Sequence, residues 1–257
     1  MAPKVRFKLN SIRNESDRLY GFCKPRSTGW DWTGYVFGMH PELKPRLTKS
    51  RTEKERKNTV DSYVKEYVGE EKELMKSQAA VYQKEWNRVN DRYMRVLSQI
   101  LETDWPKERK MINAYVSINP ICPRFLDQWS FSISMLRRLK GVRKVTSHEV
   151  LHFLYFKKWK EVFPNARRET YESPHLEWHL SEILAPIILG DPRIQRVIKV
   201  RDQNYPEHQK AMIGKTSVVR YFEDLYAKSR KRGDSFSRFL EIAYSEAKRN
   251  KSSILRS

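Results

Sequence analysis

The sequence predicts an α+β protein that is mostly helical, with a small mixed β-sheet packed on a central helix and with helical N- and C-terminal extensions. Apolar residues recur at helical spacing over 143–162 and again over 174–189. Before these segments, the runs 111–120 and 129–135 alternate with a period of two, which is typical of strands. Two strands followed by two helices give the middle of the chain its predicted order.

Composition places the chain among globular proteins. Its 257 residues are 39% hydrophobic, which is enough for a sizeable core. No run approaches the roughly 18 apolar residues of a transmembrane helix, and no apolar segment follows the basic N-terminus as it would in a secretory signal. Cys23 and Cys122 are too few for a disulfide framework. We therefore expect a soluble, reduced, cytoplasmic protein with no membrane partner.

Net charge is the most unusual global property. The chain holds 51 Lys and Arg against 31 Asp and Glu, a formal charge of +20, and such an excess attracts nucleic acid or other acidic partners. The charge is spread along the chain and only somewhat richer at both ends. A nucleic-acid site and a plain solvated basic surface therefore both stay open.

The first part of the chain, residues 1–77, is predicted to be an aromatic and charged extension. Residues 1–50 look irregular and turn-rich, around the aromatic residues Tyr20, Phe22, Trp30, Trp32, Tyr35 and Phe37. These rings are expected to pack against a subdomain or the body of the protein, with base stacking as an alternative. A charged amphipathic helix follows over 52–76, and Gly69 suggests a break before a second helix over 79–101.

The central helix carries the motif on which the prediction of function depends. His148, Glu149 and His152 form an H-E-x-x-H arrangement, which places two imidazoles on one helix face, one turn apart. Such a pair can hold one metal ion, with the glutamate beside it to take a proton from water. The alternative is a core helix whose histidines form hydrogen bonds with their neighbours. The presence of a third ligand decides between a metal site and such a core helix.

The third ligand is expected on the helix over 174–189, for which Ser173 and Pro174 are predicted as N-cap and first residue. Glu182 lies in its most apolar part, and an unpaired buried carboxylate is costly, which favours a metal partner. The competing ligands on the same helix are Glu177, His175 and His179. Glu177 and Glu182 are five positions apart and cannot both face one ion, and we prefer Glu182.

These parts, taken in order, resemble a gluzincin-type zinc metallopeptidase, in particular the compact minigluzincin-like group. The resemblance covers about residues 80–190 and depends on the helix around Trp86, the strand at 114–117, the turn at 122–124, the motif at 148–152 and the helix segment 178–182. It implies a zinc ion held by His148, His152 and Glu182, with Glu149 as the catalytic base. It also implies a sheet whose edge strand pairs with substrate, and either 111–120 or 129–135 would form that edge.

The sequence also departs from related patterns. Tyr155 and Lys158 stand where a metzincin needs glycine and histidine, and Pro186 stands where the thermolysin pattern has an acid, so the carboxylate that usually supports a zinc ligand is unassigned. Residues 78–192 are therefore predicted to form the catalytic domain and 193–257 a C-terminal helical extension, with helices over 217–230 and 235–248. The extension would either pack on the catalytic body or form a separate hairpin, and it could cover the active site.

The predicted function is that of a zinc-dependent metallopeptidase that hydrolyses peptide bonds of a peptide or protein substrate, with Glu149 as general base. An oxyanion donor is expected among Tyr155, Tyr171, His175 and His179. The alternative is a basic nucleic-acid-binding protein with a structural or inactive zinc site.

Overall fold

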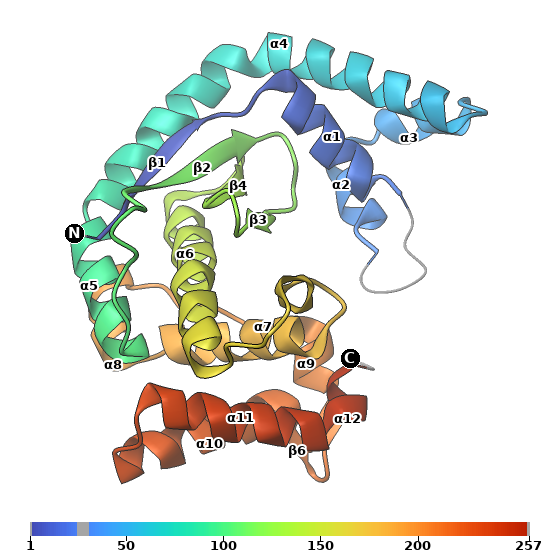
Figure 1. Cartoon of the computed structure of the whole chain (residues 1–257). Coiled ribbons are helices and arrows are strands. Elements are labelled where there is room, and N and C mark those ends of the chain that lie inside the picture. Colours follow the sequence, from blue (N-terminus) through green and yellow to red (C-terminus); the bar gives the residue numbers. More distant parts are fainter. Residues whose placement is uncertain (1, 25–30, 256–257) are drawn as a thin grey trace. The chain divides into compact units, whose positions relative to one another are not determined.

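The computed structural model describes residues 2–24 and 31–255 (Figure 1). These residues form a mostly helical α+β protein with a four-stranded mixed sheet and a separate two-stranded sheet, which confirms the predicted fold class. Within the described ranges, no helix is long and apolar enough to cross a membrane. The chain divides into two compact units, and the domain boundaries predicted at residues 77 and 192 stay a prediction. Of the described residues, one unit holds 4–24, 31–88 and 111–146; the other holds 2–3, 89–110 and 147–255.

The larger sheet belongs to the first of these units and has the strand order β1-β2-β4-β3. Strands β1 (Lys4–Leu9), β2 (Met111–Ser117) and β4 (Ser130–Ser134) run parallel, and β3 (Arg124–Phe125) pairs antiparallel with β4. The two predicted strands are therefore confirmed as β2 and β4. The prediction that one of them forms the edge is wrong, because β1 and β3 flank them on either side.

The N-terminal region is more regular than predicted. Besides β1 it forms helices α1 (Ile12–Phe22), α2 (Thr33–Met39) and α3 (Leu43–Thr48), so the expectation of an irregular segment was wrong. Among the aromatic residues, Trp32 contacts the rings of Phe22 and Tyr35, whereas Trp30 lies outside the described residues.

Helix α4 (Glu53–Asn87) is one continuous helix of 35 residues that runs beside β1, so the predicted break at Gly69 is also wrong (Figure 1). A capping box starts the helix: the Thr52 side chain accepts from the Glu55 backbone N–H, and the Glu55 carboxylate accepts from that of Thr52. Apart from the neighbouring backbone of α4 itself, no described atom lies within 4 Å of where a Gly69 side chain would start. A glycine at such an open position costs a helix only about 1 kcal/mol, which packing along the rest of the helix can offset.

The second unit is almost entirely helical. Its helices are α5 (Asn90–Leu101), the later residues of α6 (Leu139–Val162), α7 (Leu176–Leu189), α8 (Pro192–Ile198), α9 (Pro206–Lys210), α10 (Val218–Arg232), α11 (Phe236–Arg249) and α12 (Lys251–Leu255). A 3-10 turn (Arg168–Tyr171) precedes α7, and the hairpin of β5 (Met212–Ile213) and β6 (Thr216–Ser217) precedes α10. The predicted helices at α6, α7, α10 and α11 are confirmed to within a few residues.

The start of α7 differs from the prediction. His175 is the N-cap, and Ser173 and Pro174 belong to the preceding turn, in which the His175 backbone N–H donates to the Glu172 carbonyl. The helix itself is apolar around most of its circumference, which is typical of a helix with neighbours on all sides. Helices α10, α11 and α12 contact it, so the C-terminal helices pack on the helix that carries Glu182 and do not form a separate hairpin.

Candidate metal centre

Helix α6 presents the two motif histidines side by side. His148 and His152 are four positions apart, which is about 6 Å along the helix axis and slightly more than one turn. The turn just before them is fixed by α5, because the Tyr93 hydroxyl donates a 2.5 Å hydrogen bond to the Ser147 carbonyl. The His152 side chain is fully buried and stacks on Phe156, whereas 15% of the His148 side chain is exposed.

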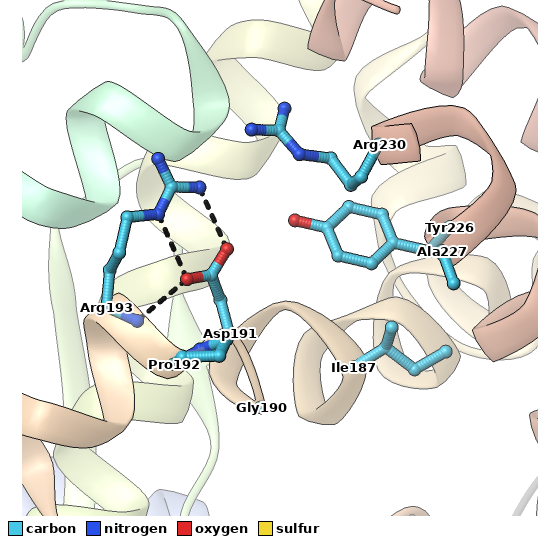
Figure 2. A pocket seen from close by; sticks show the side chains of 8 residues that line it. All are labelled: Ile187, Gly190, Asp191, Pro192, Arg193, Tyr226, Ala227 and Arg230. Atoms are coloured by element: carbon cyan, nitrogen blue, oxygen red, sulfur yellow. Dashed lines mark hydrogen bonds and ion pairs between the residues drawn. The ribbon is translucent and has the colours of Figure 1, made fainter. Parts of the chain in front are cut away.

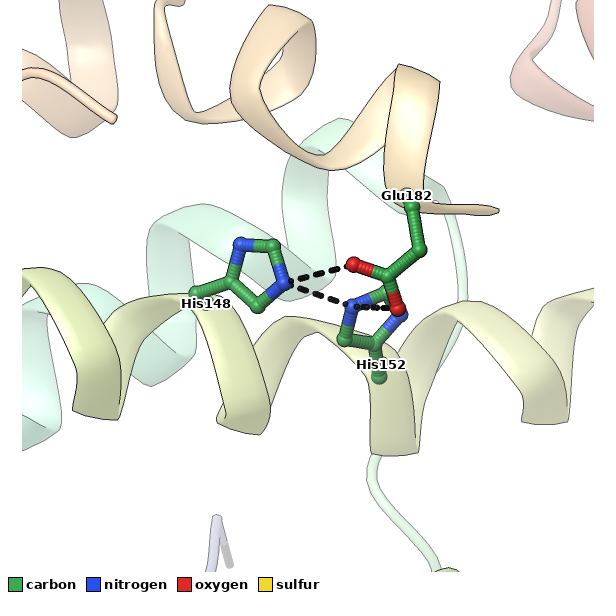
Figure 3. Close-up of side chains that lie close together, drawn as sticks. All are labelled: His148, His152 and Glu182. Atoms are coloured by element: carbon green, nitrogen blue, oxygen red, sulfur yellow. Dashed lines mark hydrogen bonds and ion pairs between the residues drawn. The ribbon is translucent and has the colours of Figure 1, made fainter. Parts of the chain in front are cut away.

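Glu182 on α7 completes the group (Figure 3). Its carboxylate is buried, with Oε2 at 3.1 Å from His148 Nε2 and Oε1 at 3.4 Å from His152 Nε2. The two histidine Nε2 atoms are 3.0 Å apart. The three side chains could hold a metal ion, because each offers a ligand atom and these atoms all lie within 4.8 Å of one another.

The spacing of these atoms fits a tetrahedral ion. Ligand bonds of about 2.0–2.2 Å at tetrahedral angles separate neighbouring ligand atoms by about 3.3 Å. The observed separations of 3.0, 3.1 and 3.4 Å are all within a few tenths of this value. Two imidazoles and one carboxylate are also a donor set that leaves the fourth position of a catalytic zinc ion open. The residues therefore fit such an ion without rearrangement of the helices.

Asp202 lies beside the candidate metal centre, although the sequence did not point to it. It lies after α8 and its carboxylate accepts from His148 Nδ1 at 2.6 Å, a distance typical of a charge-assisted bond. Its side chain is 5% exposed. A carboxylate on the far nitrogen of a ligating imidazole fixes the ring orientation and raises its basicity. Asp202 is therefore placed where a carboxylate would support His148 as a metal ligand, a position for which the sequence had suggested no residue.

The loop that carries Asp202 is attached to α7. The Asn204 side-chain amide donates to the carbonyls of Glu182, at 3.2 Å, and of Ile183, at 2.9 Å. At the other end of the loop, the Gln195 amide donates to the carbonyls of Leu189 and Val200. The position of Asp202 is thus tied to the same helix that positions Glu182.

The charges around His148 favour its protonated form when no metal is bound. Burial alone would lower its pKa, but Asp202 and then Glu182 outweigh burial and hold the pKa of His148 well above its ordinary value. A metal ion at Nε2 must replace that proton, and the two carboxylates that favour the proton also favour the cation.

Glu149 follows His148 on α6 and is 8% exposed. Successive residues on a helix are rotated by about 100°, so Glu149 lies beside the histidine face and not on it. That placement suits a base next to a metal ion and not a fourth ligand. Its role as general base stays a prediction.

Two of the competing residues on α7 take other positions in the fold. Glu177 accepts a 2.6 Å hydrogen bond from the Tyr244 hydroxyl of α11, and His175 is the N-cap of α7. Tyr155 and Tyr171 are buried, each with its ring against Phe156. These contacts do not show which of the expected residues would be the oxyanion donor, so that role stays a prediction.

His179, the fourth of the expected oxyanion donors, is buried against a second histidine that the sequence did not point to. Its Nδ1 lies 2.9 Å from Nε2 of His208 on α9, so one ring donates and the other accepts. Burial lowers the pKa of both to about 4, which keeps both neutral at physiological pH. No periodicity in the short segment 206–210 marks His208 in advance.

No known protein family, curated protein or solved structure matches this chain, so the chemistry of the site is inferred from its own residues.

Proposed function

We propose that the protein is a zinc-dependent metallopeptidase that cleaves peptide or protein substrates. The observation that carries the proposal is the convergence of His148, His152 and Glu182 at the spacing of a tetrahedral ion, with Asp202 behind His148. An ordinary core histidine is satisfied by one or two hydrogen bonds. Three ligand atoms that meet at one point, one of them oriented by a further buried carboxylate, are typical of a metal centre.

The residues would divide the work as follows. When bound, zinc would polarise a substrate carbonyl and lower the pKa of water. Glu149 would accept a proton from the attacking water on its carboxylate and then donate that proton to the leaving amine nitrogen. Asp202 would hold the His148 ring with Nε2 directed at the ion. The thiols of Cys23 and Cys122 suit the reducing cytoplasm in which we propose that the protein acts.

Metal content and peptidase activity, measured together, test the proposal. We expect purified protein to hold one zinc ion and to cleave casein. Glu149→Ala should keep the zinc and lose cleavage, whereas Glu182→Ala should lose both. Glu177→Ala is the matched control, because it removes another carboxylate of α7, one that accepts from the Tyr244 hydroxyl. This variant should retain both the zinc and the cleavage of casein.

Wild-type protein that holds no zinc after purification and reconstitution would overturn the metal assignment. Zinc held by His148, His152 and Glu182 without cleavage of any peptide would overturn the peptidase assignment alone.

The formal charge of +20 favours one other candidate, a nucleic-acid-binding protein in which any zinc site is structural or inactive. Basic residues end α10 (Arg230, Lys231, Arg232) and α11 (Lys248, Arg249). Under this alternative, affinity for DNA or RNA falls steeply with salt and is the same in wild type and Glu182→Ala. Weak binding of DNA and RNA at low salt would exclude this alternative.

A further inference from the structure

A second site lies at the C-terminal end of α7, in a pocket of about 520 Å³ that shares no residue with the candidate metal centre (Figure 2). We call it the Tyr226 pocket. Helices α7, α8 and α10 line it with Ile187, Gly190, Asp191, Pro192, Arg193, Tyr226, Ala227 and Arg230. Its volume is within the range of sites that take small organic molecules, about 300–1,000 Å³.

Tyr226 is the residue that points to a ligand. It is 8% exposed, and its hydroxyl is buried without a hydrogen-bond partner among the described residues. Its ring is held edge-on against Phe239 at 5.0 Å, so the hydroxyl stays directed into the pocket (Figure 2). Burial raises the pKa of Tyr226 to about 12, with a further increase from Asp191, so the hydroxyl keeps its proton and is a donor. A phenylalanine would pack as well without leaving a buried donor unsatisfied, which costs stability.

The two arginines of the pocket differ in how firmly they are held. Arg193 donates to both carboxylate oxygens of Asp191, through Nε at 3.0 Å and an Nη at 2.8 Å. The Arg230 guanidinium lies 3.9 Å from the Glu102 carboxylate, beyond hydrogen-bond distance, and 35% of the Arg230 side chain is exposed. The Arg230 guanidinium lies on the same side of the pocket as the Tyr226 hydroxyl (Figure 2). A small shift of the long Arg230 side chain would let one ligand group contact both the guanidinium and the Tyr226 hydroxyl.

The charges and the lining define the ligand. Two guanidinium groups and one carboxylate leave the pocket with one excess positive charge, which suits a monoanion. Arginine and a tyrosine hydroxyl together match the two oxygens of a carboxylate. The remaining lining is mainly apolar, formed by Ile187, Pro192 and Ala227.

We propose that the Tyr226 pocket binds a small organic carboxylate. The Tyr226 hydroxyl and the Arg230 guanidinium donate to its anionic group, and its apolar body lies on the aliphatic lining. The Asp191–Arg193 pair forms the opposite wall and excludes a dianion, because Asp191 repels the second charge. This site is independent of the metal and of the proposed peptidase activity.

Benzoate is a suitable probe, because it combines one carboxylate with an apolar ring. Titrations of the full-length protein by calorimetry should show binding of benzoate and at least tenfold weaker binding of benzyl alcohol, which has the ring without the charge. Inorganic phosphate, which has charge without an apolar body, should also bind at least tenfold more weakly. Tyr226→Phe and Arg230→Gln should each raise the Kd for benzoate about tenfold, the effect of one lost hydrogen bond to a charged group.

Lys231→Gln is the matched control, since it removes the same charge from an exposed position next to Arg230, and its Kd should equal that of wild type. The unliganded Tyr226→Phe protein should have an unchanged or raised Tm, because the lost hydroxyl has no partner among the described residues. A lowered Tm would show that the hydroxyl is structural and overturn the proposal. Absence of benzoate binding at millimolar concentration would do the same, as would equal Kd values in wild type, Tyr226→Phe and Arg230→Gln. Phosphate bound as tightly as benzoate would refute the organic ligand.

Discussion

Replacement of Asp202 by asparagine tests the most specific feature of the candidate metal centre. Asn is nearly the same size and can still accept from His148 Nδ1, so the change removes charge and leaves the packing in place. In the wild type, Asp202 Oδ2 lies 2.6 Å from His148 Nδ1 and the Asp202 side chain is 5% exposed, so water screens the interaction between the two side chains little. A hydrogen bond to a charged group in such a setting contributes about 1.5–3 kcal/mol.

That free energy corresponds to a loss of zinc affinity of about ten- to a hundredfold, since about 1.4 kcal/mol is a factor of ten. The same range is found when carboxylates behind metal-bound histidines are removed from other proteins. We expect the loss to be larger at high pH. At low pH the ion must displace the proton on His148, which Asp202 also stabilises, so part of the effect cancels.

The assay is a zinc titration against a chromophoric chelator of known affinity, at two pH values. Glu207→Gln is the control, because it removes one negative charge from an exposed position five residues away. If Asp202→Asn binds zinc as tightly as Glu207→Gln at high pH, Asp202 does not support a metal ligand and the assignment of this carboxylate is refuted.

Three further predictions concern buried polar groups. Asn204→Ala frees the Asp202 loop from α7 and should weaken zinc binding severalfold in the same titration; unchanged affinity would show that the loop holds its position without this amide. Because His179 and His208 have pKa values lowered from 6.5 to about 4, the unfolded chain takes up protons first as pH falls, so stability should decrease by a few kcal/mol from pH 6.5 to 4. Urea unfolding at pH values above and below this window measures the loss of stability, and His208→Gln should make the loss smaller. A free energy of unfolding that does not change with pH would contradict the prediction. Tyr82→Phe removes a hydroxyl within 3.2 Å of the carbonyls of Ser134, Met135 and Arg137, at the end of β4, and should lower the free energy of unfolding in urea by about 1–3 kcal/mol; an unaltered midpoint would mean that water replaces the hydroxyl.

The parts of the site that lie on long helices could be predicted from the sequence. His148 and His152 share a face because four residues make about one turn, and Glu182 faces inward because its neighbours on α7 are apolar. These are local rules. Asp202 follows no local rule, because its position depends on the side chain of Asn204 and on the turn after α8. One signal was present: it is the only acid between Asp191 and Glu207.

The N-terminal half shows where local signals mislead. In β1, Val5, Phe7 and Leu9 alternate with basic residues, a strand pattern that was present but was overlooked in a region judged irregular from its glycines and prolines. Two glycines in α2 and one proline in α3 argue against helices that nevertheless form, since packing overrides propensity in short segments. The same holds for α4 at Gly69.

The candidate metal centre also acts on the connectivity of the chain. It joins His148 on α6 to Glu182, which lies 34 positions later in the sequence, and to Asp202, which lies 54 positions later. An ion held by His148, His152 and Glu182 would link α6 to α7 and add its binding free energy to the stability of the folded chain, whereas the hydrogen bond to Asp202 closes the longer loop without a metal. Without the ion, the segments between α6 and α9 would open more often and offer cleavage sites to other proteases. Copies that fail to acquire their metal would therefore be degraded first, so the protein that persists would be the loaded form.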